Sequence, residues 1–161
     1  MKDIEILIPT YNEEDNIETV INELNQNGFY NITLLDANST DQTVLIAKKY
    51  NCKIILDNDK INGFGGSVIN GLNKVESDYF CIFDGDGSFN PDDIFKMKKK
   101  IDENYDFVFA SRYVNGEISE DDDVYSKFGN FFFTKIVRIL FNINTSDVLF
   151  LYVLGKKNNI K

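Results

Sequence analysis

The sequence contains no histidine and only two cysteines among its 161 residues. Without histidine, the chain cannot form a Ser-His-Asp or Cys-His catalytic group, or a zinc site that uses imidazole. Cys52 and Cys81 both lie inside apolar runs. This placement predicts two reduced thiols in the core rather than a disulfide.

Long apolar runs and an excess of basic charge are also missing. No window of about 18 uncharged apolar residues occurs, and the first residues, MKDIEILIPTYNEE, lack a signal-peptide pattern. We therefore expect a cytoplasmic protein. The net charge of −9 argues against a nucleic-acid partner, which requires a basic face. A composition of 43% hydrophobic and 27% charged residues is typical of a globular protein, and we expect one domain over 1–161.

β-rich apolar runs alternate with helical patterns along the first two thirds of the chain. The predicted strands cover 4–9, 31–36, 52–57, 78–84 and 106–111, and the predicted helices cover 13–27, 39–50, 66–76 and 90–103. Such alternation predicts an α/β fold with a mainly parallel sheet flanked by helices. Ligands of these sheets bind outside the carboxyl ends of the strands, where most of the unusual polar residues of this sequence fall.

The ends of the first two predicted strands carry PTYNEE and LLDANSTD. Tyr11 can stack on a nucleobase, Glu13 can accept from ribose hydroxyls, and Asp36 can accept from a base N–H. The simpler alternative is a pair of strand-to-helix turns with Asn12 and Ser39 (or Thr40) as helix caps. The third candidate, NGFGG, is either a flexible turn or an anion-binding helix start.

FDGDGS, at the end of the fourth predicted strand, has several interpretations. Asp84 and Asp86 are hard oxygen donors that suit Mg²⁺ or Mn²⁺ on a diphosphate. The same letters resemble the first motif of haloacid-dehalogenase-like phosphatases, in which Asp84 would be the nucleophile. They also suit a simple turn with positive φ at the glycines. Arg112, in ASRY, is either a phosphate ligand or half of a surface ion pair.

The last third of the sequence differs in character. Residues 115–123 form an acidic loop, 125–141 a predicted helix, and 147–157 a predicted strand. The helix carries several Phe residues together with Lys135 and Arg138. It would either lie at a membrane surface and meet a lipid phosphate, or pack its Phe residues under the sheet.

In this order, the motifs IPTYNEEDNI, LLDANSTDQT, NGFGGSVINGL, FDGDGSFNPDDI and ASRY resemble the family 2 glycosyltransferases of GT-A fold. The nearest likeness is to the polyprenyl-phosphate (dolichol-phosphate) mannosyl- and glucosyltransferase branch, over residues 4–157. The resemblance implies inverting transfer from a UDP- or GDP-linked sugar to a lipid-phosphate or saccharide acceptor, with Mg²⁺ or Mn²⁺, at the inner membrane surface. It places Pro9, Thr10, Tyr11, Glu13, Asp36, Asp84 and Gly85 on the nucleotide, Asp84 and Asp86 on the metal and in catalysis, and Arg112 on a phosphate.

The sequence departs from the family pattern at three places. Ala37 follows Asp36 where a second acid is usual, and Ser88 stands where relatives often have another metal donor. Family members commonly continue past this point with an acceptor part, so residues 114–161 would form only its shortened start, with Asp147 as the late acid. A nucleotide-sugar-binding module without catalysis is therefore a second interpretation. Sugar nucleotidyltransferases are disfavoured, because they use a glycine-rich loop after the first strand.

Overall fold

The computed structural model describes residues 3–56, 63–112, 133–140, 146–147 and 149–160. The chain divides into two compact units, one of Met1–Val108 with Val153–Lys161 and one of Phe109–Tyr152. The expected single domain over 1–161, with a nucleotide-sugar part at 1–113, stays a prediction. The predicted acidic loop at 115–123 lies outside the described residues.

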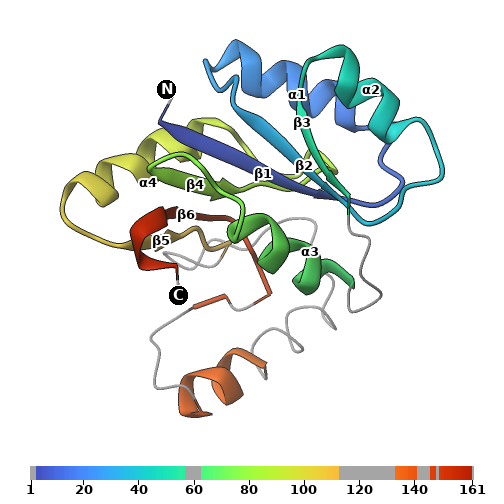
Figure 1. The fold of residues 1–161 in the computed structure, drawn as a ribbon. Coiled ribbons are helices and arrows are strands. Elements are labelled where there is room, and N and C mark those ends of the chain that lie inside the picture. Colours follow the sequence, from blue (N-terminus) through green and yellow to red (C-terminus); the bar gives the residue numbers. More distant parts are fainter. Residues whose placement is uncertain (1–2, 57–62, 113–132, 141–145, 148, 161) are drawn as a thin grey trace. The chain divides into compact units, whose positions relative to one another are not determined.

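A six-stranded sheet forms the centre of the first unit, in the order β3-β2-β1-β4-β6-β5 (Figure 1). The strands are β1 (Ile4–Thr10), β2 (Ile32–Asp36), β3 (Lys53–Leu56), β4 (Tyr79–Ile82), β5 (Phe107–Phe109) and β6 (Val153–Lys156). β1 pairs in parallel with β2 and β4, and β2 pairs in parallel with β3. β6 runs antiparallel to β4. The prediction of a mainly parallel α/β sheet is confirmed.

Three helices connect the parallel strands: α1 (Ile17–Gln26), α2 (Thr43–Lys49) and α3 (Gly63–Leu72). A fourth helix, α4 (Asp92–Asp102), leads from β4 to β5. Figure 1 shows α1 and α2 on one side of the sheet and α3 on the other. Because both faces are covered, every residue of β1 is buried. The helical spacing expected in 13–27 is confirmed, since Ile17, Val20, Ile21 and Leu24 are the buried residues of α1.

The structure corrects two of the predicted boundaries. The glycine-rich stretch is not a turn ahead of a helix, because Gly63 and Gly65 already belong to α3. The final strand spans only Val153–Lys156 instead of 147–157. Composition favoured the longer strand, but the antiparallel ladder with β4 begins only at Val153, which pairs with Ile82 at the end of β4.

The predicted cap of the second helix is also wrong. α2 begins at Thr43, and neither Ser39 nor Thr40 caps it. Instead Asp41 Oδ1 accepts from Thr43 N at 3.0 Å, which satisfies one of the free amides of the first turn. Asn90 serves α4 in the same way, because its Oδ1 accepts from Asp92 N at 3.0 Å.

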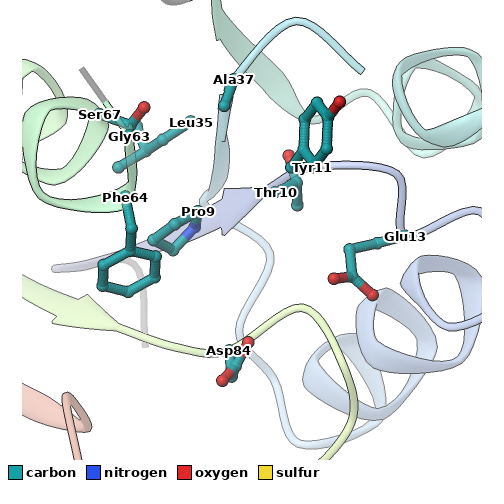
Figure 2. A pocket seen from close by; sticks show the side chains of 10 residues that line it. All are labelled: Pro9, Thr10, Tyr11, Glu13, Leu35, Ala37, Gly63, Phe64, Ser67 and Asp84. Atoms are coloured by element: carbon teal, nitrogen blue, oxygen red, sulfur yellow. The ribbon is translucent and has the colours of Figure 1, made fainter. Parts of the chain in front are cut away.

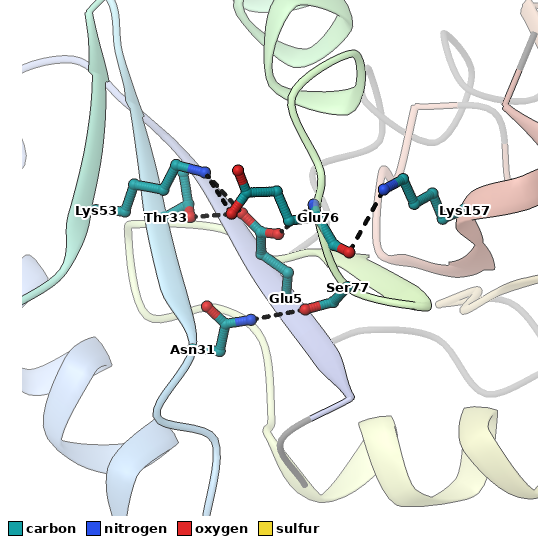
Figure 3. A network of polar contacts seen from close by, with 7 residues as sticks. All are labelled: Glu5, Asn31, Thr33, Lys53, Glu76, Ser77 and Lys157. Atoms are coloured by element: carbon teal, nitrogen blue, oxygen red, sulfur yellow. Dashed lines mark hydrogen bonds and ion pairs between the residues drawn. The ribbon is translucent and has the colours of Figure 1, made fainter.

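A buried acid lies at the amino-terminal ends of the parallel strands. Glu5 is 2% exposed, and its two carboxylate oxygens accept from Thr33 Oγ1 (2.8 Å) and Glu76 N (3.0 Å). Lys53 Nζ lies 4.0 Å from Glu5 Oε1 and 3.6 Å from Glu76 Oε2. The contacts link the starts of β1, β2 and β3 to the segment before β4 (Figure 3). The protein therefore supplies hydrogen bonds and a cation to this acid from its own chain.

Candidate active site

A cavity of about 450 Å³ lies at the carboxyl ends of β1, β2 and β4, beside the start of α3 (Figure 2). This is the edge at which parallel sheets bind ligands. Its walls are formed by Pro9, Thr10, Tyr11, Glu13, Leu35, Ala37, Gly63, Phe64, Ser67 and Asp84. Five of these were predicted as site residues from the sequence, namely Pro9, Thr10, Tyr11, Glu13 and Asp84.

The walls of the cavity divide by chemistry. Pro9, Leu35 and Ala37 are apolar, and the rings of Tyr11 and Phe64 are 60% and 54% exposed. Two carboxylates, Glu13 and Asp84, complete the lining. Figure 2 shows Phe64 and Leu35 on the side of the cavity opposite Glu13, whereas Tyr11 lies on the side of Glu13. The cavity can therefore hold a flat apolar group at one end and a polar or cationic group at the other.

Sequence reasoning missed Phe64, Ser67, Leu35 and Ala37. Phe64 and Ser67 enter the cavity because α3 starts at Gly63 and packs closely on the sheet. A Cβ at Gly71 would lie 2.4 Å from Leu35 Cδ1, so only glycine permits this approach. The lone aromatic residue in NGFGG could have indicated a ligand site, since a Phe between glycines has little reason of its own to be in an exposed turn.

Asp36 ends β2 but does not line the cavity. It is 1% exposed, and its carboxylate accepts from Ser39 Oγ (2.5 Å), Ser39 N (3.0 Å) and Thr10 Oγ1 (3.3 Å). Leu35 and Ala37, its neighbours on either side, form the cavity wall. Because side chains alternate along a strand, these two residues and Asp36 point in opposite directions.

The acids of FDGDGS follow β4. Asp84 Oδ1 accepts from Gly85 N at 2.7 Å, and Asp86 Oδ1 accepts from Ser88 N at 2.8 Å. Burial raises the pKa of Asp84, and the charges of Asp86 and Glu13 raise this pKa further, while backbone hydrogen bonds oppose the shift. Within the described residues, no lysine or arginine forms an ion pair with either aspartate. The site therefore holds negative charge that a bound cation would stabilise.

Gly85 keeps the two acids close to the first strand. A Cβ at this position would meet Thr10 Cγ2 at 3.3 Å, Ile8 Cγ2 at 3.4 Å and Glu13 Cγ at 3.5 Å. The missing side chain thus lets the segment after β4 pass directly over the end of β1. This close approach explains why Asp84 and Glu13 influence each other.

The donor set fits Mg²⁺ or Mn²⁺ on a diphosphate. No cluster of three or more acidic, histidine or cysteine residues able to hold a metal occurs in the described part of the chain. Mg²⁺ is usually bound by only one or two carboxylates, with phosphate oxygens and water as its other ligands. Asp84 and Asp86 meet that requirement. Burial is the largest cause of the raised pKa of Asp84, and a cation would offset the like charges of Asp86 and Glu13 that add to it.

Arg112 and Asp147 belong to the second unit, where they form an ion pair. Arg112 Nε lies 2.9 Å from Asp147 Oδ2, and Arg112 Nη2 donates to Asp147 Oδ1 at 3.3 Å. The side chain of Asp147 is fully buried, whereas that of Arg112 is 28% exposed. This is the ion-pair alternative considered for Arg112, and its role as a phosphate ligand stays a prediction.

The described part of the predicted late helix covers residues 133–140. Ile139 and Leu140 are 72% and 70% exposed, and Lys135 and Arg138 are exposed beside them. Thr134 is buried. No helix in the described residues is long and apolar enough to cross a membrane.

Comparison with known proteins identifies the fold. Glucosyl-3-phosphoglycerate synthase from Mycobacterium tuberculosis, in a crystal structure with UDP, matches 98% of this chain at a TM-score of 0.74 and 16% identity. A structure of that enzyme with Mn²⁺, UDP and phosphoglyceric acid matches 98% of the chain at a TM-score of 0.71 and 17% identity. These matches cover 57% and 56% of the longer chains. The chain has the predicted GT-A fold.

Several curated proteins are similar in sequence. UDP-N-acetylglucosamine–dolichyl-phosphate N-acetylglucosaminyltransferase of Methanococcus voltae is 31% identical over 164 residues, which cover 89% of this chain. Dolichol-phosphate mannosyltransferase of Pyrococcus furiosus is 31% identical over 77% of the chain, and glycosyltransferase AglJ of Haloferax volcanii is 32% identical over 68%. The matches span 65%, 37% and 36% of those proteins, respectively.

The family description "Glycosyl transferase family 2" matches residues 5–158, nearly the whole sequence. This match favours the glycosyltransferase interpretation of FDGDGS over the phosphatase interpretation. The chain belongs to glycosyltransferase family 2.

Proposed function

We propose that this chain binds a UDP- or GDP-linked sugar at the carboxyl edge of its sheet and transfers the sugar with inversion. One observation carries the proposal: a single cavity combines an aromatic and apolar end with an acidic end in which Asp84 has no cation from the described chain. Such a cavity is matched to a base, a ribose and a metal–diphosphate in that order.

The apolar end would hold the nucleoside. Tyr11 and Phe64 offer exposed ring faces on which a base can stack, and Pro9 adds an apolar surface between them. Glu13, on the same side of the cavity as Tyr11, would accept from the ribose hydroxyls. Thr10 and Gly85 would contact the nucleotide through their backbone, where the segments after β1 and β4 meet.

The acidic end would act on the diphosphate. Asp84 and Asp86 would hold Mg²⁺ or Mn²⁺, which neutralises the charge that develops on the leaving diphosphate. Fixed carboxylates are useful here because their position is set before the reaction begins. The hydrogen bonds from Gly85 N and Ser88 N orient the two carboxylates in this way.

A lipid phosphate is the acceptor class that we propose. The relative from Methanococcus voltae is named as a dolichyl-phosphate N-acetylglucosaminyltransferase, and the relative from Pyrococcus furiosus as a dolichol-phosphate mannosyltransferase. A phosphate oxygen is already ionised, so its attack needs no strong general base. In the described helix 133–140, exposed Ile139 and Leu140 with Lys135 and Arg138 would suit a peripheral position at a membrane surface. A saccharide acceptor remains the alternative.

A thermal-shift panel tests the nucleotide and metal together. We expect UDP or GDP with Mn²⁺ or Mg²⁺ to raise the Tm by stabilising the folded state, and Asp86→Ala to remove the increase. The Tm should be measured with each of UDP, GDP and dTDP, in the presence and in the absence of metal. A panel in which none of them raises the Tm in the presence of metal would refute the proposal.

A nucleotide-sugar-binding module without transfer is the second candidate. Two observations favour it: the described residues lack a third acidic metal ligand, and the late acid Asp147 is bonded to Arg112. Radiolabelled sugar transfer to a short polyprenyl phosphate and to simple saccharides separates the two. Nucleotide binding without any transfer would support the module.

A further inference from the structure

The loop after β1 is held by the loop after β2 through three consecutive backbone amides. Asn12 N donates to Ser39 Oγ (3.0 Å), Glu13 N to Thr43 Oγ1 (2.8 Å) and Glu14 N to Asp41 Oδ2 (3.0 Å). Tyr11 and Glu13, which line the cavity, are part of this segment. The conformation of the cavity wall therefore depends on side chains that lie outside the cavity.

Two carboxylates orient the hydroxyls that accept hydrogen bonds from the amides of Asn12 and Glu13. Ser39 Oγ donates to Asp36 Oδ1 at 2.5 Å, and Thr43 Oγ1 donates to Asp41 Oδ1 at 2.6 Å. A hydroxyl has one proton to donate, so bonding it to a carboxylate leaves its lone pairs for the amide. Hydrogen bonds to an ionised acceptor are also shorter and stronger than neutral ones. The amides of Asn12 and Glu13 are thus each connected to a charge through one hydroxyl, whereas Glu14 N bonds directly to the Asp41 carboxylate.

The contacts run in both directions between the two loops. Asn12 Oδ1 accepts from Thr40 N, and Glu14 Oε2 accepts from Gln42 N, each at 2.8 Å. Asn12 also has a φ of 56°, in the left-handed region that most residues avoid. A conformation of this kind persists only where the surrounding contacts fix it.

We propose that Asp36 and Asp41 are positioning residues that act through Ser39 and Thr43 on the loop carrying Tyr11 and Glu13, and that Asp36 does not contact the base. This inference rests on the proposed function, because the loop is positioned for a nucleotide. Asp36 is 1% exposed and has three intramolecular donors, whereas the cavity wall beside it is Ala37.

The test compares UDP with CDP in the presence of Mn²⁺, or GDP with ADP if guanine is the base that binds. Uracil has an N3–H donor, whereas cytosine has a lone pair at that position. A positioning residue affects both ligands alike, because it changes the loop and not the base contact. We expect Asp36→Asn and Ser39→Ala to lower the affinities for UDP and for CDP by about the same factor, on the order of tenfold. Thr40→Ala keeps the backbone donor to Asn12 (2.8 Å) and removes only the longer contact from Thr40 Oγ1 to Asn12 Oδ1 (3.4 Å). It is therefore the matched control and should leave both affinities nearly unchanged.

Amide hydrogen exchange of the ligand-free protein gives a second readout. We expect the amides of Asn12 and Glu13 to exchange faster in Asp36→Asn and in Ser39→Ala than in the wild type or Thr40→Ala. If Asp36→Asn does not fold, Ser39→Ala, which removes one hydroxyl, carries both measurements.

The outcomes separate the two proposals. A wild type that binds no nucleotide refutes the proposed function, and hydrogen exchange alone then decides on the positioning role. A loss confined to UDP in Asp36→Asn would make Asp36 a ligand of the base and overturn the inference. Unchanged affinities together with unchanged exchange rates in both variants would also overturn it.

Discussion

Asp36 ends β2 and Asp41 follows it, whereas Asp84 and Asp86 follow β4, and both pairs lie at the carboxyl edge of the parallel strands. Ser39, Thr43 and backbone amides of the protein itself already bind the first pair. Burial opposes the ionisation of Asp41, but the hydrogen bonds from Thr43 and from Glu14 N outweigh it and lower its pKa. Among the described residues, the second pair has backbone donors only, and the pKa of Asp84 is raised.

The difference shows that a D-x-D spacing or a strand-end acid does not by itself indicate a ligand. What distinguishes the two pairs is whether the fold already compensates the charge. Glu5, at the opposite edge of the sheet, resembles the first pair, because Thr33, Glu76 N and Lys53 surround it. Asp84 and Asp86 are the acids for which a bound cation would supply what the described chain does not.

The largest expected effect is on ligand binding at the second pair. Asp86→Asn removes one of the two charges proposed to hold the cation, so we expect the Mn²⁺-dependent affinity for UDP to fall by about 100-fold. Isothermal titration measures the change. Asp92→Asn, at an exposed position in the first turn of α4, is the matched control. If the wild type and Asp86→Asn bound UDP with equal affinity, the Asp84/Asp86 pair would have no binding role that the Asp36/Asp41 pair lacks.

Glu5→Ala should lower the free energy of unfolding by roughly 3 kcal/mol, because it leaves Thr33 and Glu76 N without their buried acceptor. Urea denaturation measures this change. The affinity for UDP should stay at the wild-type value, since Glu5 lies at the edge opposite the cavity. A stable Glu5→Ala protein with weakened UDP binding would contradict the division between the two edges.

Gly71→Ala tests how closely α3 must approach the sheet. The new Cβ would overlap the Leu35 side chain, so we expect a loss of about 1–3 kcal/mol and weaker UDP binding, because α3 carries Phe64 and Ser67. Gly65→Ala in the same helix is the control. Nothing lies within 4 Å of its Cβ, so stability should stay the same or rise. Similar behaviour of the two variants would rule out close packing as the reason for Gly71.

The smallest expected effect is a gain in stability. The raised pKa of Asp84 means that its ionised form disfavours the folded state at neutral pH. Asp84→Asn should therefore raise the Tm of the ligand-free protein at pH 7 by a few degrees, within about 4 °C. The difference should shrink as the pH falls through the raised pKa of the folded state, and it should vanish below about pH 3, where the wild-type carboxyl is protonated in both states. A lower Tm for Asp84→Asn at pH 7 would show that the carboxylate stabilises the fold instead.

The fold and half of the cavity lining could be predicted from sequence. Alternating strand and helix periods predicted the mainly parallel sheet, and the spacing of Ile17, Val20, Ile21 and Leu24 predicted the buried face of α1. Tyr11, Glu13 and Asp84 were found because strand ends at one edge of a parallel sheet must be neighbours, and the family resemblance added Pro9 and Thr10.

Other features required the tertiary structure. Phe64 and Ser67 reached the cavity because Gly71 lets α3 pack against Leu35, a contact between residues 36 positions apart in the chain. Asp36 and Asp84 both follow apolar strands and look alike in sequence. Only the packing of the β1 and β2 loops turned Asp36 towards Ser39 and left Ala37 on the cavity wall.

By itself, the sequence determined which residues gather at the carboxyl edge, because strand direction and hydrophobic period are local properties. Only the tertiary structure decided what each acid there does, because the pKa and partners of a carboxylate depend on groups brought near it from distant segments. Asp36 found its partners in the neighbouring loop. Asp84 is partly buried beside the like charges of Asp86 and Glu13, and a cation there would offset both effects.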